Sequence, residues 1–345
     1  MALRILIKTS LLLTVVVIML GAYTRLSDAG LGCPDWPGCY GHLTVPNEHH
    51  ELAAASERFP HLTVEADKAW AEMIHRYFAG TLGLVVLAIA VFCIRNRHLP
   101  TGHGIALALV IVFQALLGMW TVTMKLLPLV VMGHLLGGFT LLCLLSLLYW
   151  RVRLNPNAIA ALNQPDGPLI TPGVKRFATL ALAVVIIQIA LGGWTSSNYA
   201  ALMCTSLPLC EGNWLQSLDF ANAFQLIHFG HDSYEFGVLD YEARMTIHVT
   251  HRIGAIVTAV VVLISALLCV TQQDSTLRSA GRRMMLALVI QLGLGITNVV
   301  FSLPLMVAVA HNIGAAFLLV STLYTNYLLW SGVEIPQVNK ERVHE

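Results

Sequence analysis

Two short clusters of ionisable residues open apolar segments of this 345-residue chain. The first contains Glu72, His75 and Arg76, and the second repeats the histidine–arginine pair as His251 and Arg252, with a histidine in place of the glutamate. Ionisable groups at membrane depth are costly, so such clusters mark functional sites by default. The shared pair predicts a task that both clusters perform, and the glutamate predicts a task that one performs alone.

Four histidines are expected at one common depth in the membrane. His75, His134, His251 and His311 each lie near the beginning of an apolar segment. Two imidazoles that face each other across an apolar four-helix core can ligate a haem iron from both sides. Zinc would favour a more compact site, usually with four ligands. A single such histidine is more often hydrogen-bonded to a neighbouring helix, but four in a duplicated pattern favour haem.

Three arginines are candidates for contacts with the haem propionates. Arg25 ends the first apolar segment, and Arg76 and Arg252 each follow a candidate iron ligand. The guanidinium group pairs well with carboxylates. The alternative interpretation is that these side chains only reach for the membrane interface.

Four cysteines form two pairs with the same C-x5-C spacing. Cys33 and Cys39 lie in the first long loop, and Cys204 and Cys210 lie in the third. Both loops are expected on the oxidising outer side, so each pair predicts a small loop disulfide. A structural role is favoured, and a redox role for these cysteines is the alternative.

The composition predicts that these residues belong to a membrane protein. The chain is 57% hydrophobic and only 11% charged, with a net charge of +1, and its mean hydropathy is +0.71. A soluble domain is about 25% charged, and the small net charge argues against a nucleic-acid partner. Segments of about 20 apolar residues span a bilayer. Eight occur, near residues 5–25, 69–95, 102–123, 129–150, 174–196, 243–270, 281–303 and 306–330.

Charged residues orient these eight segments. Arg95, Arg151 and Arg278 are among the basic residues that fall on one side, whereas the two long loops on the other side are acidic. By the positive-inside rule, both termini are cytoplasmic and the long loops, with the histidine clusters, lie towards the outer face. The sequence therefore predicts an integral protein of a bacterial-type inner membrane.

The chain repeats itself. We expect two tandem four-helix bundles, residues 1–155 and 174–345, joined by a cytoplasmic linker at 156–173 and related by a pseudo-two-fold axis along the membrane normal. The fold class is thus all-α and integral to the membrane. Corresponding residues, 171 to 177 positions apart, are Gly21 and Gly192, Cys33 and Cys204, His75 and His251, Gln114 and Gln291, and His134 and His311.

The two halves differ at one position that matters for chemistry. Glu72 of the first half corresponds to His248 of the second. A carboxylate can move protons or stabilise a cation that forms on a substrate. The first half is therefore expected to perform the reaction and the second to pass electrons. The alternative is that Glu72 is an acid near a helix start, favoured by the helix dipole.

These residues resemble the haem A synthase family. The resemblance rests on E-x-x-H-R at residues 72–76, on the second H-R at residues 251–252, and on the histidines that open the fourth and eighth segments. It also rests on the stretch GAYTRLSDAGLGCPDWP at residues 21–37. The resemblance covers all eight segments, and no departure from the family's motif pattern is found.

The resemblance implies an oxidoreductase that converts the C8 methyl group of haem O to the formyl group of haem A for terminal cytochrome oxidases. It implies that His251 and His311 hold a haem b cofactor, that His75 and His134 belong to the substrate haem site, and that Glu72 is catalytic. Haem O synthase and cytochrome oxidase assembly factors are the implied partners. The alternatives are a dihaem b-type electron carrier without haem-modifying activity and a transporter with parallel repeats.

Overall fold

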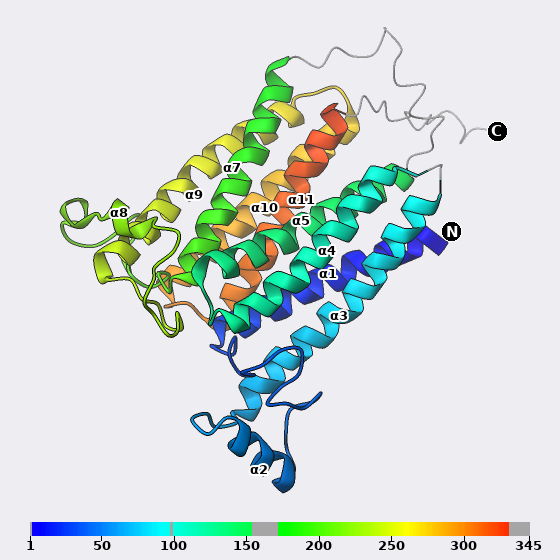
Figure 1. Cartoon of the computed structure of the whole chain (residues 1–345). Coiled ribbons are helices and arrows are strands. Elements are labelled where there is room, and N and C mark those ends of the chain that lie inside the picture. Colours follow the sequence, from blue (N-terminus) through cyan, green and yellow to red (C-terminus); the bar gives the residue numbers. More distant parts are fainter. Residues whose placement is uncertain (1, 97–98, 154–171, 331–345) are drawn as a thin grey trace.

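The computed structural model describes residues 2–96, 99–153 and 172–330, and this part of the chain is helical with no β-strand (Figure 1). Eight helices are long and apolar enough to cross a membrane, which confirms the eight predicted segments. The chain is therefore an integral membrane protein. The helices are α1 (Ala2–Leu26), α3 (Ala66–Arg95), α4 (Thr101–Thr123), α5 (Pro128–Arg153), α7 (Pro172–Ser197), α9 (Tyr241–Val270), α10 (Ser275–Val300) and α11 (Leu305–Trp330).

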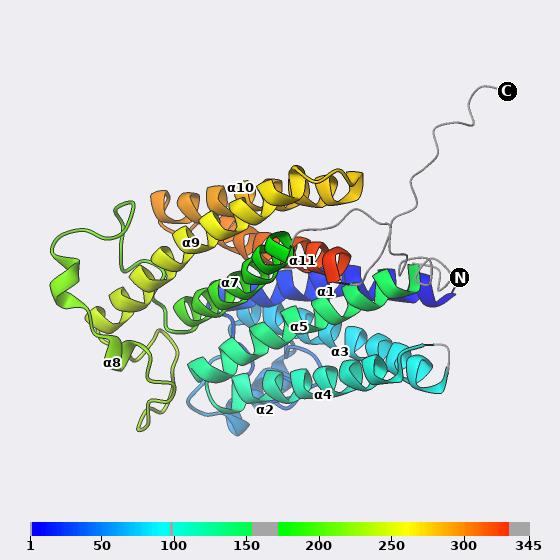
Figure 2. The ribbon, with the colours of Figure 1, turned by 90° about the horizontal axis from the view of Figure 1, so that it is seen from above.

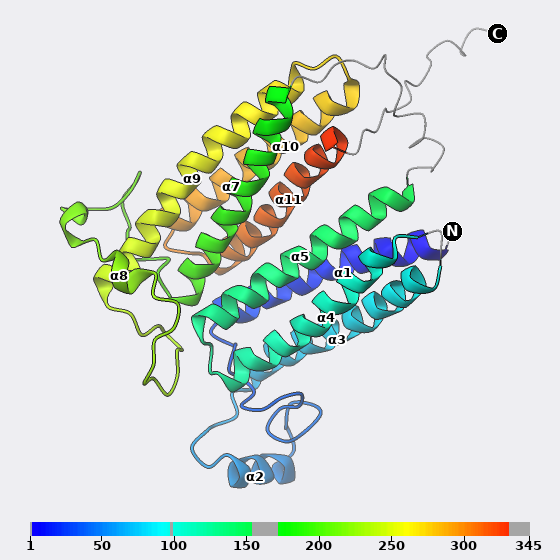
Figure 3. The same cartoon turned by 45° about the horizontal axis from the view of Figure 1, so that its top comes forward.

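The spanning helices form two neighbouring groups of four (Figures 2 and 3). In the first group α1, α3, α4 and α5 pack in sequence and α5 returns to α1. In the second group α7, α9, α10 and α11 do the same, and α11 returns to α7. The groups meet where α1 and α5 pack against α11 and where α5 packs against α7. The pseudo-two-fold relation remains a prediction, and residues 154–171, most of the predicted linker, lie outside the described residues.

Apolar side chains fill the space between the two groups. One core cluster joins Phe139 and Leu142 of α5 to Val185 of α7 and to Leu318 and Leu319 of α11. The outer surfaces are also apolar, as helices in contact with lipid must be, because lipid cannot satisfy exposed polar groups. Close contact packs these helices, and hydrogen bonds between them, such as that from Asn326 of α11 to the Ala178 carbonyl oxygen of α7, add to it.

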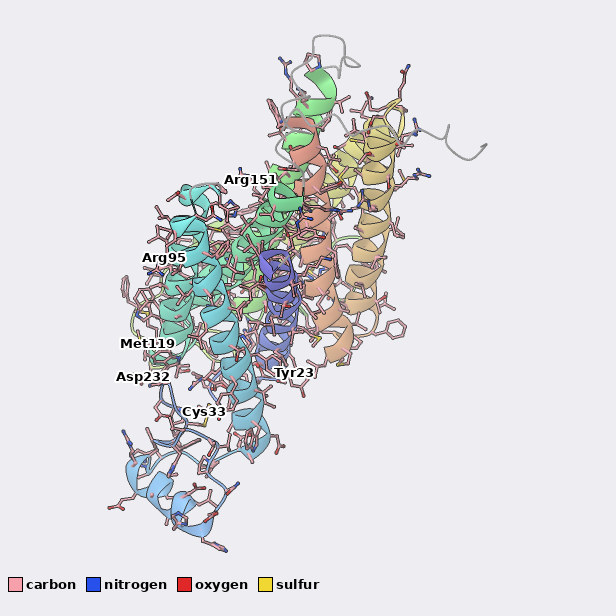
Figure 4. The ribbon with its side chains drawn as sticks, turned by 90° about the vertical axis from the view of Figure 1, so that its right-hand side faces the viewer. Tyr23, Cys33, Arg95, Met119, Arg151 and Asp232 are labelled. Atoms are coloured by element: carbon pink, nitrogen blue, oxygen red, sulfur yellow. A yellow bond between two sulfur atoms is a disulfide. The ribbon has the colours of Figure 1, made fainter. Side chains whose placement is uncertain are left out.

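The two long loops lie at the same end of the helices. The first contains α2 (His49–Arg58), and the third contains the short helices η2 (Trp214–Ser217) and α8 (Phe220–Ala223). Arg95 and Arg151 lie at one end of the molecule, and Cys33 and Asp232 lie towards the other (Figure 4). These two arginines thus lie far from Asp232, although other basic residues, among them Arg76 and Arg252, lie beside the long loops. The orientation of the chain in the membrane remains a prediction.

Corresponding glycines bring helices close together in both groups. A side chain at Gly104 of α4 would lie 2.9 Å from the Ala90 carbonyl oxygen of α3, and one at Gly281 of α10 would lie 2.7 Å from the Ala266 carbonyl oxygen of α9. Among the described residues, no atom outside the surrounding backbone of α10 lies within 4 Å of a side chain placed at Gly293, in the same helix as Gly281. Small residues of this kind allow membrane helices to approach each other.

We expect Gly281→Ala to lower the stability of the folded protein because the new methyl group must push the α9 backbone away. Overpacking of this kind costs about 1–3 kcal/mol. The matched variant Gly293→Ala should hold or raise the melting temperature, since alanine is favoured over glycine in a helix by up to about 1 kcal/mol. Thermal unfolding in detergent compares the two, and equal melting temperatures would contradict the close-packing role of Gly281.

Candidate functional site

A large cavity lies in the first group of helices, with a volume of about 920 Å³. This volume is near the upper end of ligand pockets, which hold about 300–1,000 Å³. Trp36, Pro37 and Leu43 of the first long loop contribute to its wall. The same cavity is lined by five of the predicted site residues: Arg25, Glu72, His75, Arg76 and His134.

His75 of α3 and His134 of α5 lie close together, with a distance between ring centres that is near the one expected for two ligands of a shared iron. Their ring centroids are 6.4 Å apart, and the ring planes are inclined at 84°. Bonds from imidazole nitrogen to a metal are about 2.0 Å long, and the ring centre lies about 1.1 Å behind that nitrogen, so opposed axial ligands have centroids about 6.2 Å apart. Nδ1 of His134 is buried and has no hydrogen-bond partner. The neighbouring helices alone therefore do not satisfy this histidine pair.

Each of the four histidine rings rests against a glycine of the preceding spanning helix. A side chain on any of these glycines would meet the ring at 3.0 to 3.4 Å, so glycine leaves room for the imidazole. Two of these glycines, Gly118 and Gly295, were not among the predicted site residues, although their spacing of 177 residues equals that of Gln114 and Gln291. The contacts are Gly21 with His75, Gly118 with His134, Gly192 with His251, and Gly295 with His311.

Glutamines hold the two histidines of the second half. The side-chain amide of Gln188 lies 3.0 Å from Nδ1 of His251 and donates to its carbonyl oxygen at 2.9 Å. The amide of Gln291 lies 3.3 Å from Nε2 of His311, whose Nδ1 is buried without a partner. Groups behind a ligand fix the orientation of its ring. These two histidines therefore fit a permanently bound haem.

The first half restrains its histidines less. Gln114 donates only to the carbonyl oxygen of His134, at 3.1 Å, and not to the ring. The position that corresponds to Gln188 is Val17, which lines the cavity and cannot form a hydrogen bond through its side chain. This looser arrangement fits a haem that enters and leaves.

Glu72 is held by the first disulfide loop and faces the cavity. The side chain is only 4% exposed. Its Oε2 accepts a hydrogen bond from the backbone N–H of Cys33 at 2.8 Å, and its Oε1 pairs with the Arg76 guanidinium. Arg76 in turn donates to backbone carbonyl oxygens of the loop, those of Asp35 at 2.9 Å and Gly38 at 2.5 Å. The carboxylate therefore has a fixed position and a nearby positive charge.

The second half builds the same frame around His248. The Cys204 N–H lies 3.2 Å from Nδ1, and the Arg252 Nε–H lies 3.2 Å from Nε2. Arg252 donates to the carbonyl oxygens of Ser206 at 2.5 Å and Leu209. A neutral imidazole has one acceptor nitrogen, so it satisfies one of these two donors, whereas a carboxylate in the same place satisfies both. The frame suits an acid, and only the first half has one.

The predicted cysteine pairs are joined in the structure. Disulfide bonds connect Cys33 to Cys39 and Cys204 to Cys210. Each closes the loop whose carbonyl groups bind the arginine of the neighbouring helix. This arrangement favours the structural role of the pairs, since each disulfide shapes a carbonyl cage.

The three arginines predicted to contact propionates differ in how many of their guanidinium N–H groups already have hydrogen-bond partners. Arg25 donates to the Ser196 carbonyl oxygen at 2.6 Å and stacks on the Tyr199 ring at 3.9 Å, but its buried Nε has no partner. Arg76 lines the cavity and already binds the loop and Glu72. Arg252 binds loop carbonyl groups through both terminal nitrogens. Propionate binding by these arginines remains a prediction, and only Arg25 and Arg76 line the cavity.

No group of three or more His, Cys, Asp or Glu side chains in the described part of the chain is placed to hold a metal ion. Two opposed histidines on a large cavity are the arrangement of axial haem ligands, and a zinc site would need more ligands close together. The donor set therefore fits haem.

Known proteins with similar sequences support this assignment. The sequence profile of the COX15-CtaA family, described as cytochrome oxidase assembly protein, matches residues 4–323. The heme A synthase of Shewanella oneidensis is 54% identical over 334 residues, which cover 96% of this chain and 97% of that protein. The heme A synthases of Granulibacter bethesdensis and Paracoccus denitrificans are 26% and 25% identical over 94% and 92% of this chain, and over 86% and 85% of their own lengths.

The second disulfide loop should respond to acid through Glu211. Its carboxylate accepts hydrogen bonds from the backbone N–H and hydroxyl groups of Ser206 and Thr205. These bonds lower the pKa of Glu211 to about 2 from an ordinary value of 4.5, and the bond from the Ser206 N–H has the largest effect. A lowered pKa stabilises the fold above pH 4.5, and this stabilisation is lost as the pH falls towards 2.

We therefore expect Glu211→Gln to lower the melting temperature at pH 6, and the difference from the wild type to shrink between pH 4.5 and pH 2. Thermal unfolding across this pH range measures the effect. Glu57→Gln, a change at an exposed acid of α2, is the control and should show no such trend. A difference that stays constant with pH would contradict the role of Glu211.

Proposed function

This chain belongs to the COX15-CtaA family of cytochrome oxidase assembly proteins, and we propose that it is a haem A synthase. It oxidises the C8 methyl group of haem O to the formyl group of haem A. The observation that carries this conclusion is the cavity in which Glu72 lies beside the opposed His75 and His134. The likeness to the Shewanella oneidensis heme A synthase over nearly the whole of both chains supports the same activity.

The cavity of the first half is the substrate site in this proposal. His75 and His134 ligate the iron of haem O, and the 6.4 Å between their rings accommodates it. The loop residues Trp36 and Pro37 close the outer side of the cavity. Arg25 and Arg76 line this cavity, so these two of the three arginines are placed to bind a propionate.

The second half holds a haem b cofactor through His251 and His311. Their contacts with Gln188 and Gln291 orient both rings, as a permanent site requires. Haem b when bound supplies one-electron redox chemistry. The protein must carry electrons away because the conversion of a methyl to a formyl group, with water counted as the source of oxygen, releases four electrons and four protons.

Glu72 handles protons at the reacting carbon. The Cys33 N–H and Arg76 keep one carboxylate in place, and a positioned carboxylate accelerates proton transfer and stabilises positive charge that develops nearby. The alternative of an acid placed by the helix dipole fits poorly. Glu72 is the seventh residue of α3, whereas the dipole acts within the first turn.

The orientation in the membrane follows from charge. We infer that both termini are cytoplasmic and that both haem sites lie towards the outer face of a bacterial inner membrane. We also infer that haem O synthase and cytochrome oxidase assembly factors are the partners of this enzyme. The segregation of Arg95 and Arg151 from the acidic loops supports this orientation.

Glu72→Gln should abolish most haem A production. The amide keeps an oxygen for the Cys33 N–H but removes the base, and loss of such a group lowers rates by about 10²- to 10⁴-fold. Cells supplied with haem O are analysed by extraction and mass measurement of their haems. Glu242→Gln, in the first turn of α9, is the control and should retain haem A. Full haem A production by Glu72→Gln would contradict the catalytic assignment.

His251→Ala and His311→Ala should each abolish the stable b-type spectrum of the purified protein, because an axial ligand is lost. His61→Ala, in the first long loop, should leave the spectrum unchanged. A spectrum that survives both changes would show that the cofactor ligands lie elsewhere. A wild-type protein that binds two haems but never yields haem A would instead be the dihaem electron carrier, and one without Soret absorption would favour a transporter.

A further inference from the structure

The cavity of the first half is not built by the first half alone. Three of the residues that line it come from the second half: Gly193 and Ser196 of α7 and Asn312 of α11. Helix α11 reaches this cavity because it packs against both α1 and α5. Asn312 also follows His311 directly, so one helix serves both haem sites.

His311 and Asn312 point to different sides of α11. Successive residues of a helix are about 100° apart around its axis. The ring of His311 lies against α10, where a side chain on Gly295 would come within 3.2 Å of it. Asn312 lies on the cavity of the first half. Its Nδ2 donates to the Ala308 carbonyl oxygen at 3.0 Å, and within the described residues Oδ1 has no hydrogen-bond partner.

The corresponding position in the first half is apolar. Leu135 follows His134 as Asn312 follows His311, and it packs near Gly193, where a side chain would lie 3.6 Å from it. The amide of α11 is therefore a departure from the repeat. Glu72 is another such departure, and both lie on the same cavity. Two residues that differ in chemistry from their counterparts in the other half thus line the cavity where the substrate is proposed to bind.

We propose that Asn312 is a substrate-positioning residue whose Oδ1 accepts a hydrogen bond from a hydroxyl group at the edge of the bound haem. This inference rests on the proposed function and names the chemistry that its cavity recognises. Asn312 is only part-buried, so its Oδ1 is not sealed off from a ligand. A ligand that brings a donor to this acceptor forms a hydrogen bond that a ligand without a donor cannot form, so the first is favoured. Haem O carries a hydroxyl group on its isoprenoid side chain, and haem B has none. A second hydroxyl group arises on the methyl carbon when it is half oxidised.

The test compares Asn312→Leu, which installs the residue of the corresponding position, with Asn312→Asp, which keeps an acceptor oxygen in the same place. Both variants are purified as full-length protein with haem b, and an unchanged b-type spectrum establishes that His311 and the fold are intact. Affinities for haem O and haem B are measured by absorbance titration, and the haems produced from haem O are identified by mass.

We expect Asn312→Leu to weaken binding of haem O about 10-fold and to leave haem B unaffected, as the loss of one hydrogen bond implies. Asn312→Asp should retain the preference for haem O. If the affinities stay equal to those of the wild type but a hydroxymethyl haem accumulates in Asn312→Leu, the recognised hydroxyl group is the newly formed one, and the positioning role stands.

Two results would overturn the inference: equal weakening of haem O and haem B, or a Leu variant that matches the wild type in both affinities and in products. Failure of the proposed function looks different. In that case the wild-type protein itself makes no haem A, whatever residue stands at position 312.

Discussion

The arginines of α3 and α9 impose the constraint on which both halves depend. Each guanidinium group lies in a largely apolar setting and must be surrounded by acceptors, since an unpaired buried charge is very costly. Arg76 finds them in Glu72 and in carbonyl groups of the loop closed by Cys33 and Cys39. The disulfide loop, the arginine and the helix that carries His75 therefore form one unit. Without the cage, neither His75, the proposed iron ligand, nor the acid next to it would have a defined position.

The duplicated frame explains how one architecture accommodates two tasks. In the second half, Gln188 and Gln291 hold the histidine rings, and His248 occupies the place of the acid. In the first half the rings are freer, a cavity of about 920 Å³ is open to a ligand, and the acid is present. Restraint suits a group that stays, and a cavity with a fixed carboxylate suits a group that reacts and leaves. In the function we propose, these small differences in a shared scaffold separate electron transfer from chemistry.

Much of this could be predicted from the sequence because its signals are local or periodic. Apolar length defines the eight helices, the C-x5-C spacing defines both disulfides, and the repeat brings His75 together with His134. Contacts between distant helices left weaker traces. Gly118 and Gly295 matter because a ring lies against each, and glycine is common in membrane helices for other reasons. Gln188 gives no repeat signal at all, since its counterpart is Val17. Both halves line one cavity because of how distant helices pack, and the spacing of residues along the sequence does not predict that packing.

That sharing argues that the two halves act as one catalytic unit. Arg25, near the end of α1, donates to the Ser196 carbonyl oxygen of α7 and stacks on Tyr199. The last turn of α1 in the first half is therefore fixed to the second half. The third loop also contacts the first half: the Tyr234 N–H donates to the carbonyl oxygen of Lys125, which follows α4, at 3.0 Å. Helix α11 then carries His311 to one site and Asn312 to the other. In the function we propose, electrons taken from a substrate in the first half pass to a cofactor in the second, and a boundary that shares residues between the two candidate sites keeps their separation fixed.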